Sequence, residues 1–268
     1  MLAGGVAAGA FGSLLGLGGG VLIVPLLTFG FGLPLREAVG VSLVCVIMTS
    51  SSAAGVYLER HVANMRLGMT LELFTATGAL IGGSVAFLLD ERLLLLLFAG
   101  LLIYVAITMF RAGLRAPVAQ AAVADDPVVP DRSPSSALDR LSGEGYRVRN
   151  LGRGVVGATG AGVLSALLGI GGGIVKVPLM HLSMGVPLRV ATATSNMMIG
   201  ITAAASAVIY LIRGGIDPYV AAPTAIGVFL GATAASRLAH RVDLRILRLL
   251  FVVVLSYTAV QMLLRVFE

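Results

Sequence analysis

Long apolar stretches separated by short polar ones run along the whole chain. Most of them are about 18 to 23 residues long, which is the length that a helix needs to cross a bilayer core of about 30 Å. The pattern predicts an all-α, polytopic membrane protein with four apolar segments in each half of the chain. The segments fall at about 1–33, 38–58, 68–89 and 93–110, and again at about 154–187, 190–212, 219–236 and 249–264.

The first segment of each half differs from the others because its length fits neither one crossing nor two. A continuous helix of about 34 residues would measure about 50 Å, whereas two crossings need about 40 residues. Glycines and prolines interrupt both segments, at Gly16–Gly20 and Pro34 in the first half and at Gly169–Gly173 and Pro187 in the second. We expect two half-length helices in each, as a re-entrant hairpin or as one discontinuous span, since broken backbone at membrane depth is tolerated where protein or a wet cavity surrounds it.

The two halves are related by a repeat without gaps. Residues 14–42 align with residues 167–195 at a constant offset of 153, and 15 of the 29 aligned positions carry the same residue. Each copy contains a glycine run, then Val-Pro-Leu, then Gly-x-Pro-Leu-Arg. We therefore predict a first membrane repeat over 1–113 and a second over 153–268. The segment between them, 114–152, is rich in Ala, Pro, Asp, Ser and Arg, which predicts a disordered polar linker.

The arginines favour one of two topologies, because loops on the cytoplasmic side of a membrane concentrate Lys and Arg. If the first segment of each half crosses, each half has four spans and the arginines divide eleven to seven between the two sides. If that segment re-enters, each half has three spans, the second half is inverted, and the division is fourteen to four. The larger bias favours the inverted arrangement, with the linker in the cytoplasm and both termini on the other side.

The composition supports a membrane location and excludes several other classes. Hydrophobic residues make up 57% of the chain and charged residues 12%, and the mean hydropathy is +0.98, outside the range usual for soluble domains. The formal charge of +6 comes mostly from arginines in the polar segments, so it indicates loop charge and no nucleic-acid partner. The one cysteine, Cys45, lies in an apolar stretch and offers neither a disulfide framework nor a metal-binding spacing. The N-terminus lacks the pattern of a secretory signal, so we expect residues 1–33 to be retained.

The glycine runs are the first candidates for chemistry. They lack the strand and helix spacing of a dinucleotide fingerprint and the Gly-Lys-Ser/Thr of a phosphate loop, so we expect no cofactor. One interpretation is close helix packing through small residues. The interpretation that we favour is anion binding, since exposed N–H groups at a half-helix N-terminus attract negative charge and the repeat brings two such ends face to face. It assigns substrate contacts to Gly18, Gly19, Gly20, Gly171, Gly172 and Gly173.

Two ionisable residues lie within the apolar stretches. Lys176, the one lysine of the chain, follows the second glycine run and stands where the first half has Ile23. A charge at membrane depth is costly and usually faces a cavity or a partner, so we assign Lys176 to the anion site, with a lysine that snorkels to an interface as the alternative. Glu72 aligns with Ala225 and is a candidate for proton coupling, whereas its place near the start of a span favours an interfacial role.

Small polar residues cluster after the Pro-Leu-Arg element. Ser42 and Ser195 occupy the same repeat position, and Asn196 follows the second of them. In a membrane helix such side chains either bond to a carbonyl group one turn back or point into a pathway, so all three are candidate substrate contacts. The sequence contains no Ser/His/Asp, Cys/His or His-Glu-x-x-His arrangement, so we predict no enzyme, no catalytic residues and no metal site.

With the glycine run, Val-Pro-Leu and Gly-x-Pro-Leu-Arg each present twice, the sequence resembles the TauE/SafE family of membrane proteins, also called sulfite exporters or toluene-sulfonate uptake permeases. The resemblance covers both halves and implies transport of sulfur-containing or carboxylated organic anions such as sulfite, sulfoacetate or sulfonates. We expect a multi-pass secondary transporter in a bacterial cytoplasmic membrane, with a passive anion channel as the alternative and a scaffold without cargo as a third reading. The expected partners are the small anion, the lipid bilayer and a coupling proton or cation, and a homodimer is left open.

Overall fold

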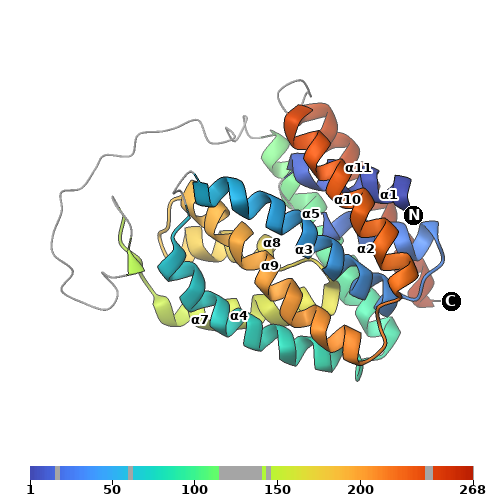
Figure 1. The fold of residues 1–268 in the computed structure, drawn as a ribbon, viewed down its shortest axis with the longest axis horizontal. Coiled ribbons are helices and arrows are strands. Elements are labelled where there is room, and N and C mark those ends of the chain that lie inside the picture. Colours follow the sequence, from blue (N-terminus) through green and yellow to red (C-terminus); the bar gives the residue numbers. More distant parts are fainter. Residues whose placement is uncertain (16–18, 60–62, 115–140, 143–145, 239–243, 268) are drawn as a thin grey trace.

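The structure is a computed structural model that describes residues 1–15, 19–59, 63–114, 141–142, 146–238 and 244–267. Apart from a single bridge residue at Tyr146, the regular elements in these residues are helices, as predicted (Figure 1). The first half contains α1 (Leu2–Leu15), α2 (Gly20–Pro25), the π-helical turn η1 (Leu26–Gly30), α3 (Leu35–Glu59), α4 (Met65–Ala86) and α5 (Glu91–Leu114). The second half contains α7 (Leu151–Leu168), α8 (Gly173–Pro178), η2 (Leu179–Ser183), α9 (Leu188–Ile212), α10 (Pro218–Leu238) and α11 (Leu244–Phe267).

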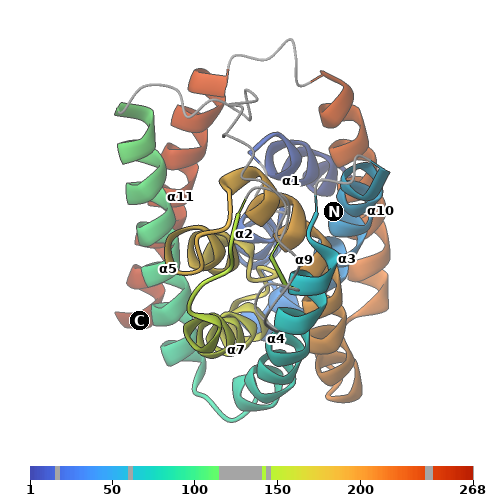
Figure 2. The ribbon, with the colours of Figure 1, turned by 90° about the vertical axis from the view of Figure 1, so that its left-hand side faces the viewer.

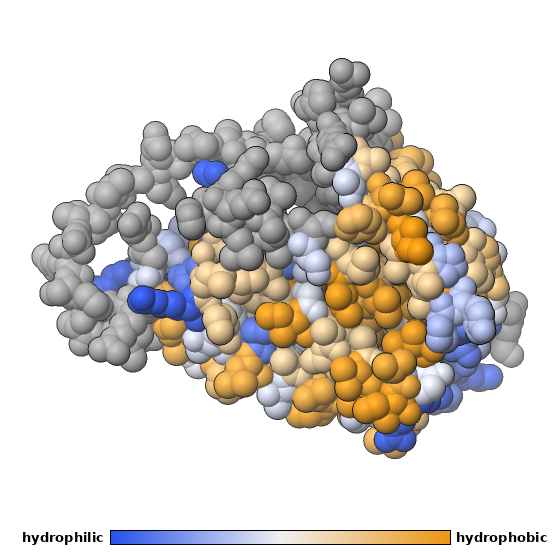
Figure 3. Space-filling view, viewed as in Figure 1, coloured by the Kyte–Doolittle hydropathy of each residue, from blue (hydrophilic) through white to orange (hydrophobic). Residues whose placement is uncertain are grey.

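Six helices in the described part of the chain are long and apolar enough to cross a membrane, namely α4, α5, α7, α9, α10 and α11. Large hydrophobic side chains remain exposed along or beside them, among them Leu73, Leu88 and Ile212. Figure 3 shows hydrophobic residues over much of the visible face, with hydrophilic residues gathered towards its two ends. Such a surface suits contact with lipid chains, in agreement with the polytopic membrane fold predicted from hydropathy.

The first apolar segment of each half is broken at the glycines, as predicted. In the first half α1 ends at Leu15 and α2 begins at Gly20, and in the second half α7 ends at Leu168 and α8 begins at Gly173. The prediction of two half-length helices is wrong for α7, which has 18 residues and is long enough to cross a membrane. Its first turn extends three residues before the apolar stretch that the hydropathy pattern marks, because polar residues are tolerated at a helix end.

Each broken segment folds back on itself as a helical hairpin. A Cβ atom on Gly4, near the start of α1, would lie 3.6 Å from the ring of Phe31, which follows η1. In the second half the Arg149 N–H, just before α7, donates to the carbonyl oxygen of Met184, just after η2, at 3.0 Å. The chain therefore leaves each hairpin close to where it entered.

Glycines allow helices of different halves to pack closely. α1 packs on α10 and α7 packs on α4. Gly9 of α1 lies against the backbone of Val228, and Gly162 of α7 lies against the backbone of Thr75, so that a Cβ atom at either glycine would collide with a carbonyl oxygen. Both residues of the second contact are related to those of the first by the offset of 153. Close approach through small residues is typical of helix interfaces in membranes.

The remaining helices form a central pair and an edge pair. α3 packs on α9, and both also contact α4 or α10. α5 packs on α11, and Figure 2 shows these two helices together at the opposite side of the molecule from α10. The start of α3 is tied to the start of α5, since the Leu35 N–H donates to a carboxylate oxygen of Glu91 at 3.3 Å.

The last part of the predicted linker is packed against the helices, which the sequence did not predict. Val148 is buried in a cluster with Leu67 and Met184. The side-chain amide of Asn64, the residue before α4, donates to the Tyr146 hydroxyl at 2.7 Å. Residues 146–148, within the predicted linker, therefore lie against the helices. The disorder predicted for 115–140 concerns residues outside the described part of the chain.

Candidate functional site

The breaks before α2 and α8 are formed by glycines with left-handed backbone. Gly19 and Gly172, the residues that precede these helices, have φ angles of 77° and 75°. A side chain is strained in this region, so glycine is the residue that adopts it without cost. A Cβ atom on Gly172 would also lie 3.3 Å from the Cβ atom of Ser165 and 3.4 Å from Cε of Lys176. Gly18 lies outside the described residues.

The two breaks meet inside the molecule. A Cβ atom on Gly20 would lie 2.5 Å from the carbonyl oxygen of Gly169, so the first helix turn of α2 touches the end of α7. The Ser42 hydroxyl oxygen lies 2.8 Å from that carbonyl oxygen and 3.3 Å from the carbonyl oxygen of Gly20. Ser42 therefore links the two breaks by donating its one hydrogen to either carbonyl group.

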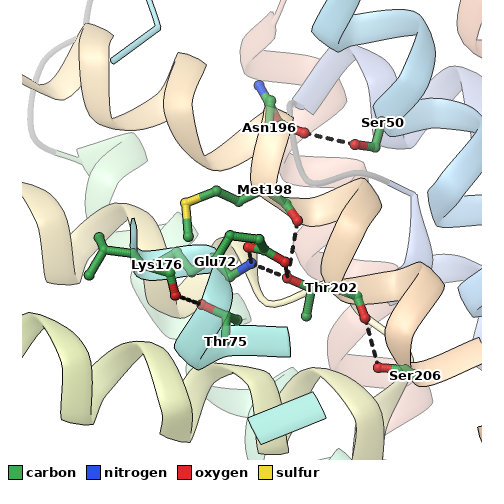
Figure 4. A network of polar contacts seen from close by, with 9 residues as sticks. Ser50, Glu72, Thr75, Lys176, Asn196, Met198, Thr202 and Ser206 are labelled. Carbon is green, nitrogen blue, oxygen red and sulfur yellow. Dashed lines mark hydrogen bonds and ion pairs between the residues drawn. The ribbon is translucent and has the colours of Figure 1, made fainter. Parts of the chain in front are cut away.

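Lys176 is buried beside the second break and is paired with Glu72. Its side chain is 1% exposed and that of Glu72 is 5% exposed, and Nζ lies 3.3 Å from Oε2 of Glu72. The Thr202 hydroxyl completes the group, since it accepts a hydrogen bond from Lys176 and lies 2.7 Å from Oε1 of Glu72. Figure 4 shows the three side chains converging from α8, α4 and α9. Sequence reasoning favoured an interfacial place for Glu72, which is wrong, and the snorkelling alternative for Lys176 does not fit its burial.

Burying an ion pair of this kind costs desolvation free energy, so a contribution to stability does not by itself explain why the pair is present. Removing two charges from water costs several kcal/mol per ion, and their attraction recovers this only with good geometry and further hydrogen bonds. Apolar residues of similar size would often serve stability as well or better. The pair is therefore more easily explained by a role in function, as for most ionisable groups inside a membrane protein.

Two buried hydroxyl groups close to the second break have no hydrogen-bond partner among the described residues. They belong to Ser165 on α7 and Ser195 on α9, and each residue is 1% exposed. Ser165 faces Gly172, and the Ser195 oxygen lies 3.7 Å from where a Cβ atom on Gly173 would be. An unpaired buried hydroxyl group costs about 1 to 3 kcal/mol, so both are available to a ligand that offers an acceptor.

The structure groups some of the predicted site residues and separates others. It places Gly172 beside Lys176, which pairs with Glu72, and it places Gly173 beside Ser195. Gly19, Gly20 and Ser42 belong to the first break. Gly171 packs against the side chains of Val46 and Ile199. Asn196 contributes its backbone carbonyl oxygen to Ser50, at 2.7 Å, and not to the ion pair (Figure 4).

Sequence reasoning missed Ser165 and Thr202. Ser165 aligns with Gly12 in the repeat, so no duplication marks it, but it lies seven residues before Gly172 on the last turns of α7. Thr202 aligns with Thr49 and lies seven residues after Ser195, two helix turns along the same face of α9. That helical spacing is the signal that could have found it.

The arrangement combines one cation, several hydroxyl donors and one carboxylate in a buried place. A cation and hydroxyl donors suit a small anion, since hydrogen bonds to charged groups are stronger than neutral ones. The carboxylate of Glu72 competes for the same cation. The described residues contain no group of three or more His, Cys, Asp or Glu side chains that could hold a metal ion.

Comparison with known proteins places the chain among membrane transporters. The family model described as sulfite exporter TauE/SafE matches residues 1–262. The probable membrane transporter protein YunE of Bacillus subtilis is 26% identical over 97% of this chain and 94% of its own length. The probable membrane transporter protein YdhB of the same organism is 25% identical over 83% of this chain and 82% of its own length. A probable membrane transporter protein of Methanocaldococcus jannaschii is 28% identical over 76% of this chain and 68% of its own length. No solved structure shows significant similarity.

Proposed function

Because the chain belongs to the sulfite exporter TauE/SafE family, we propose that it is a secondary transporter that moves small anions across the bacterial cytoplasmic membrane. Its relatives are named probable membrane transporters, which supports a transport function over an enzymatic one. The anions that we propose are sulfur-containing or organic, of the class of sulfite, sulfoacetate and sulfonates.

The observation that carries the proposal is the buried Lys176 beside two unpaired hydroxyl groups. A small oxyanion has several acceptor oxygens, so it can accept hydrogen bonds from more than one donor. Nζ lies at Thr202, two helix turns from Ser195, so in this account it turns from Thr202 and Glu72 towards Gly172 and Gly173 when the anion binds between it and the hydroxyl groups of Ser165 and Ser195. These donors surround Gly172 and Gly173, where the backbone is left without side chains. In this account an anion at Lys176 also satisfies the two hydroxyl groups that the protein alone leaves unpaired.

We propose further that the two halves are inverted repeats. Hairpins that return to their side of entry leave α3, which has 25 residues, with α4 and α5 as the crossings of the first half, and α9, α10 and α11 as those of the second, which supports inversion. Contacts between the halves agree with it, because the Arg213 guanidinium carbon, after α9, lies 6.0 Å from the ring centre of Phe87, after α4. Helices α4 and α9 therefore end on the same side, as inversion requires. Two four-span halves in the same orientation would place these ends on opposite sides of the membrane.

Inverted repeats suggest how the anion changes sides. In many transporters built this way, the substrate binds near the midplane at broken helices, and one unit rocks against the other around the fixed site. Here the two breaks meet at Gly20 and Gly169, between helices of both halves. Close glycine contacts between α1 and α10 and between α7 and α4 would tie each hairpin to a span of the other half during such a movement.

The topology is tested by cysteine labelling in a variant that lacks Cys45. We expect a cysteine at Leu2 to be labelled from outside the cell and a cysteine at Arg149 from the cytoplasm. Both residues are exposed, so each site should react without unfolding. Labelling of both from the same side would exclude the inverted arrangement.

Transport is tested with purified protein in liposomes. We expect accumulation of labelled sulfite, sulfoacetate or p-toluenesulfonate above the outside concentration when a proton gradient is imposed, and loss of accumulation when a protonophore is added. Empty liposomes and Lys176→Met protein are the controls. A passive channel would only equilibrate the anion, and no uptake of any of these anions would contradict the proposed function.

A further inference from the structure

We propose that Glu72 takes up one proton each time an anion binds at Lys176, so that anion and proton cross the membrane together. This inference rests on the proposed function, because it concerns the same site. It assigns the coupling ion and the residue that carries it, and it follows from the charges and hydrogen bonds around Glu72.

The first step is the charge of the site. Lys176 and Glu72 lie 3.3 Å apart and are both buried, so the pair is neutral as a whole. An anion added to this pair would leave one negative charge without a partner in a buried place, which is strongly unfavourable. Adding one proton with the anion restores neutrality. The carboxylate is the group that competes with the anion for Lys176, so protonation of Glu72 also removes the competitor.

The second step is the hydrogen bonding of Thr202, which provides for both charge states of Glu72. The Thr202 oxygen lies 2.7 Å from Oε1 of Glu72 and 3.0 Å from the backbone carbonyl oxygen of Met198. A hydroxyl group has one hydrogen and can donate it to one of these two acceptors at a time. With Glu72 ionised, Thr202 donates to the carboxylate. With Glu72 protonated, the carboxyl O–H donates to Thr202, which turns its own hydrogen to Met198, so neither state leaves a donor unpaired.

The third step concerns the groups around Glu72. Helix α4 packs against α7 and α9. α9 presents Thr202 to Glu72, and the contact with α7 is made by glycine and small residues such as Gly162. In the described part of the chain, the ionisable side chain that faces Glu72 is Lys176, from α8. The charge of Glu72 is therefore governed by Lys176 and by whatever ligand Lys176 holds.

The first experiment counts protons with the unmodified protein. Binding of p-toluenesulfonate, an anion that does not itself titrate near neutral pH, is measured by calorimetry in buffers of different ionisation enthalpy. We expect uptake of one proton per anion, and an apparent affinity that falls about tenfold per pH unit as pH rises. Binding without proton uptake would overturn the inference. This measurement needs no variant, so it holds even if substitution of Glu72 impairs folding.

The second experiment assigns the proton to Glu72. Glu72→Gln resembles the protonated carboxyl group permanently, so we expect it to exchange labelled for unlabelled anion across liposomes but not to accumulate anion in response to a proton gradient. Glu37→Gln, which replaces a carboxyl group in the first turn of α3, is the matched control and should accumulate anion like the parent. Gradient-driven accumulation by Glu72→Gln would overturn the assignment.

The outcomes separate this inference from the proposed function. If the parent protein binds and carries no anion, the proposed function fails and the coupling fails with it. If the parent carries anions, Lys176→Met does not, and Glu72→Gln still responds to the proton gradient, the anion site stands and the role of Glu72 is wrong.

Discussion

Replacement of Lys176 by methionine separates the anion site from the rest of the fold. Methionine keeps most of the length and apolar bulk of the lysine and removes its charge. A hydrogen bond to a charged group contributes about 1.5 to 3 kcal/mol, so we expect anion affinity to fall roughly tenfold to more than a hundredfold. Lys176→Arg should retain part of the affinity, because the charge survives while the geometry of its donors changes.

The same substitution affects stability, and the structure gives the reason. Loss of one partner from a buried ion pair costs about 3 to 5 kcal/mol when the other charge remains, and less if Glu72 becomes protonated. The double variant Lys176→Met with Glu72→Gln leaves no buried charge and should recover most of this loss. Ile23→Met is the matched control, because Ile23 is buried at the position in the first half that aligns with Lys176.

The assay is an anion titration followed by thermal melting in one detergent. Stability is read from the melting temperature without anion, and affinity from its increase with anion concentration. We expect the double variant to fold and to show no shift with sulfite or sulfoacetate, while Ile23→Met shows the shift of the parent. If Lys176→Met binds these anions with unchanged apparent affinity, the lysine is a structural residue and the reasoning is refuted.

Further substitutions separate binding from folding by the same two measurements, the melting temperature without anion and its increase with anion concentration. Gly172→Ala puts a side chain at a φ of 75° and should lower both stability, by about 1 to 2 kcal/mol, and anion affinity, whereas Gly160→Ala, in open space on α7, should lower neither. Ser195→Ala removes an unpaired hydroxyl group, so we expect stability to stay the same or rise while affinity falls about tenfold; unchanged affinity would remove Ser195 from the site. Ser42→Ala breaks a hydrogen bond that the protein already makes and should cost about 0.5 to 1.5 kcal/mol of stability. Thr202→Val should impair gradient-driven accumulation more than Thr202→Ser, which keeps the hydroxyl group; equal accumulation would argue against its part in coupling.

Hydropathy and the repeat were sufficient to predict the positions of the helix breaks. Glycine runs and prolines have local causes, since they limit the backbone wherever they occur, and the breaks before Gly20 and Gly173 follow from them. The repeat also indicated that the two breaks face one another, and the contact of Gly20 with Gly169 agrees with this. The length of α7 and the packing of Val148 depend on tertiary contacts, which hydropathy does not report.

The ion pair could not be derived from the repeat, because neither partner is repeated. Lys176 aligns with Ile23 and Glu72 with Ala225, and the two residues are separated by 104 positions. Their common property is that each is an ionisable residue inside an apolar stretch with no counterpart in the other half. Opposite charges at membrane depth usually pair, so this property would have suggested the contact. The loss of symmetry at Ser195, whose counterpart Ser42 is bonded, depends on side-chain geometry and has no signal in the sequence.

The most direct test of the central claim is a structure of the protein with a bound anion that can be identified. Selenite, the selenium counterpart of sulfite, gives an anomalous signal that marks its own position in a crystal. We predict one selenium peak within hydrogen-bonding reach of Lys176 Nζ and the hydroxyl groups of Ser165 and Ser195, with Nζ moved away from Glu72. A peak elsewhere, with Lys176 still paired to Glu72 at saturating selenite, would contradict an anion site at this lysine.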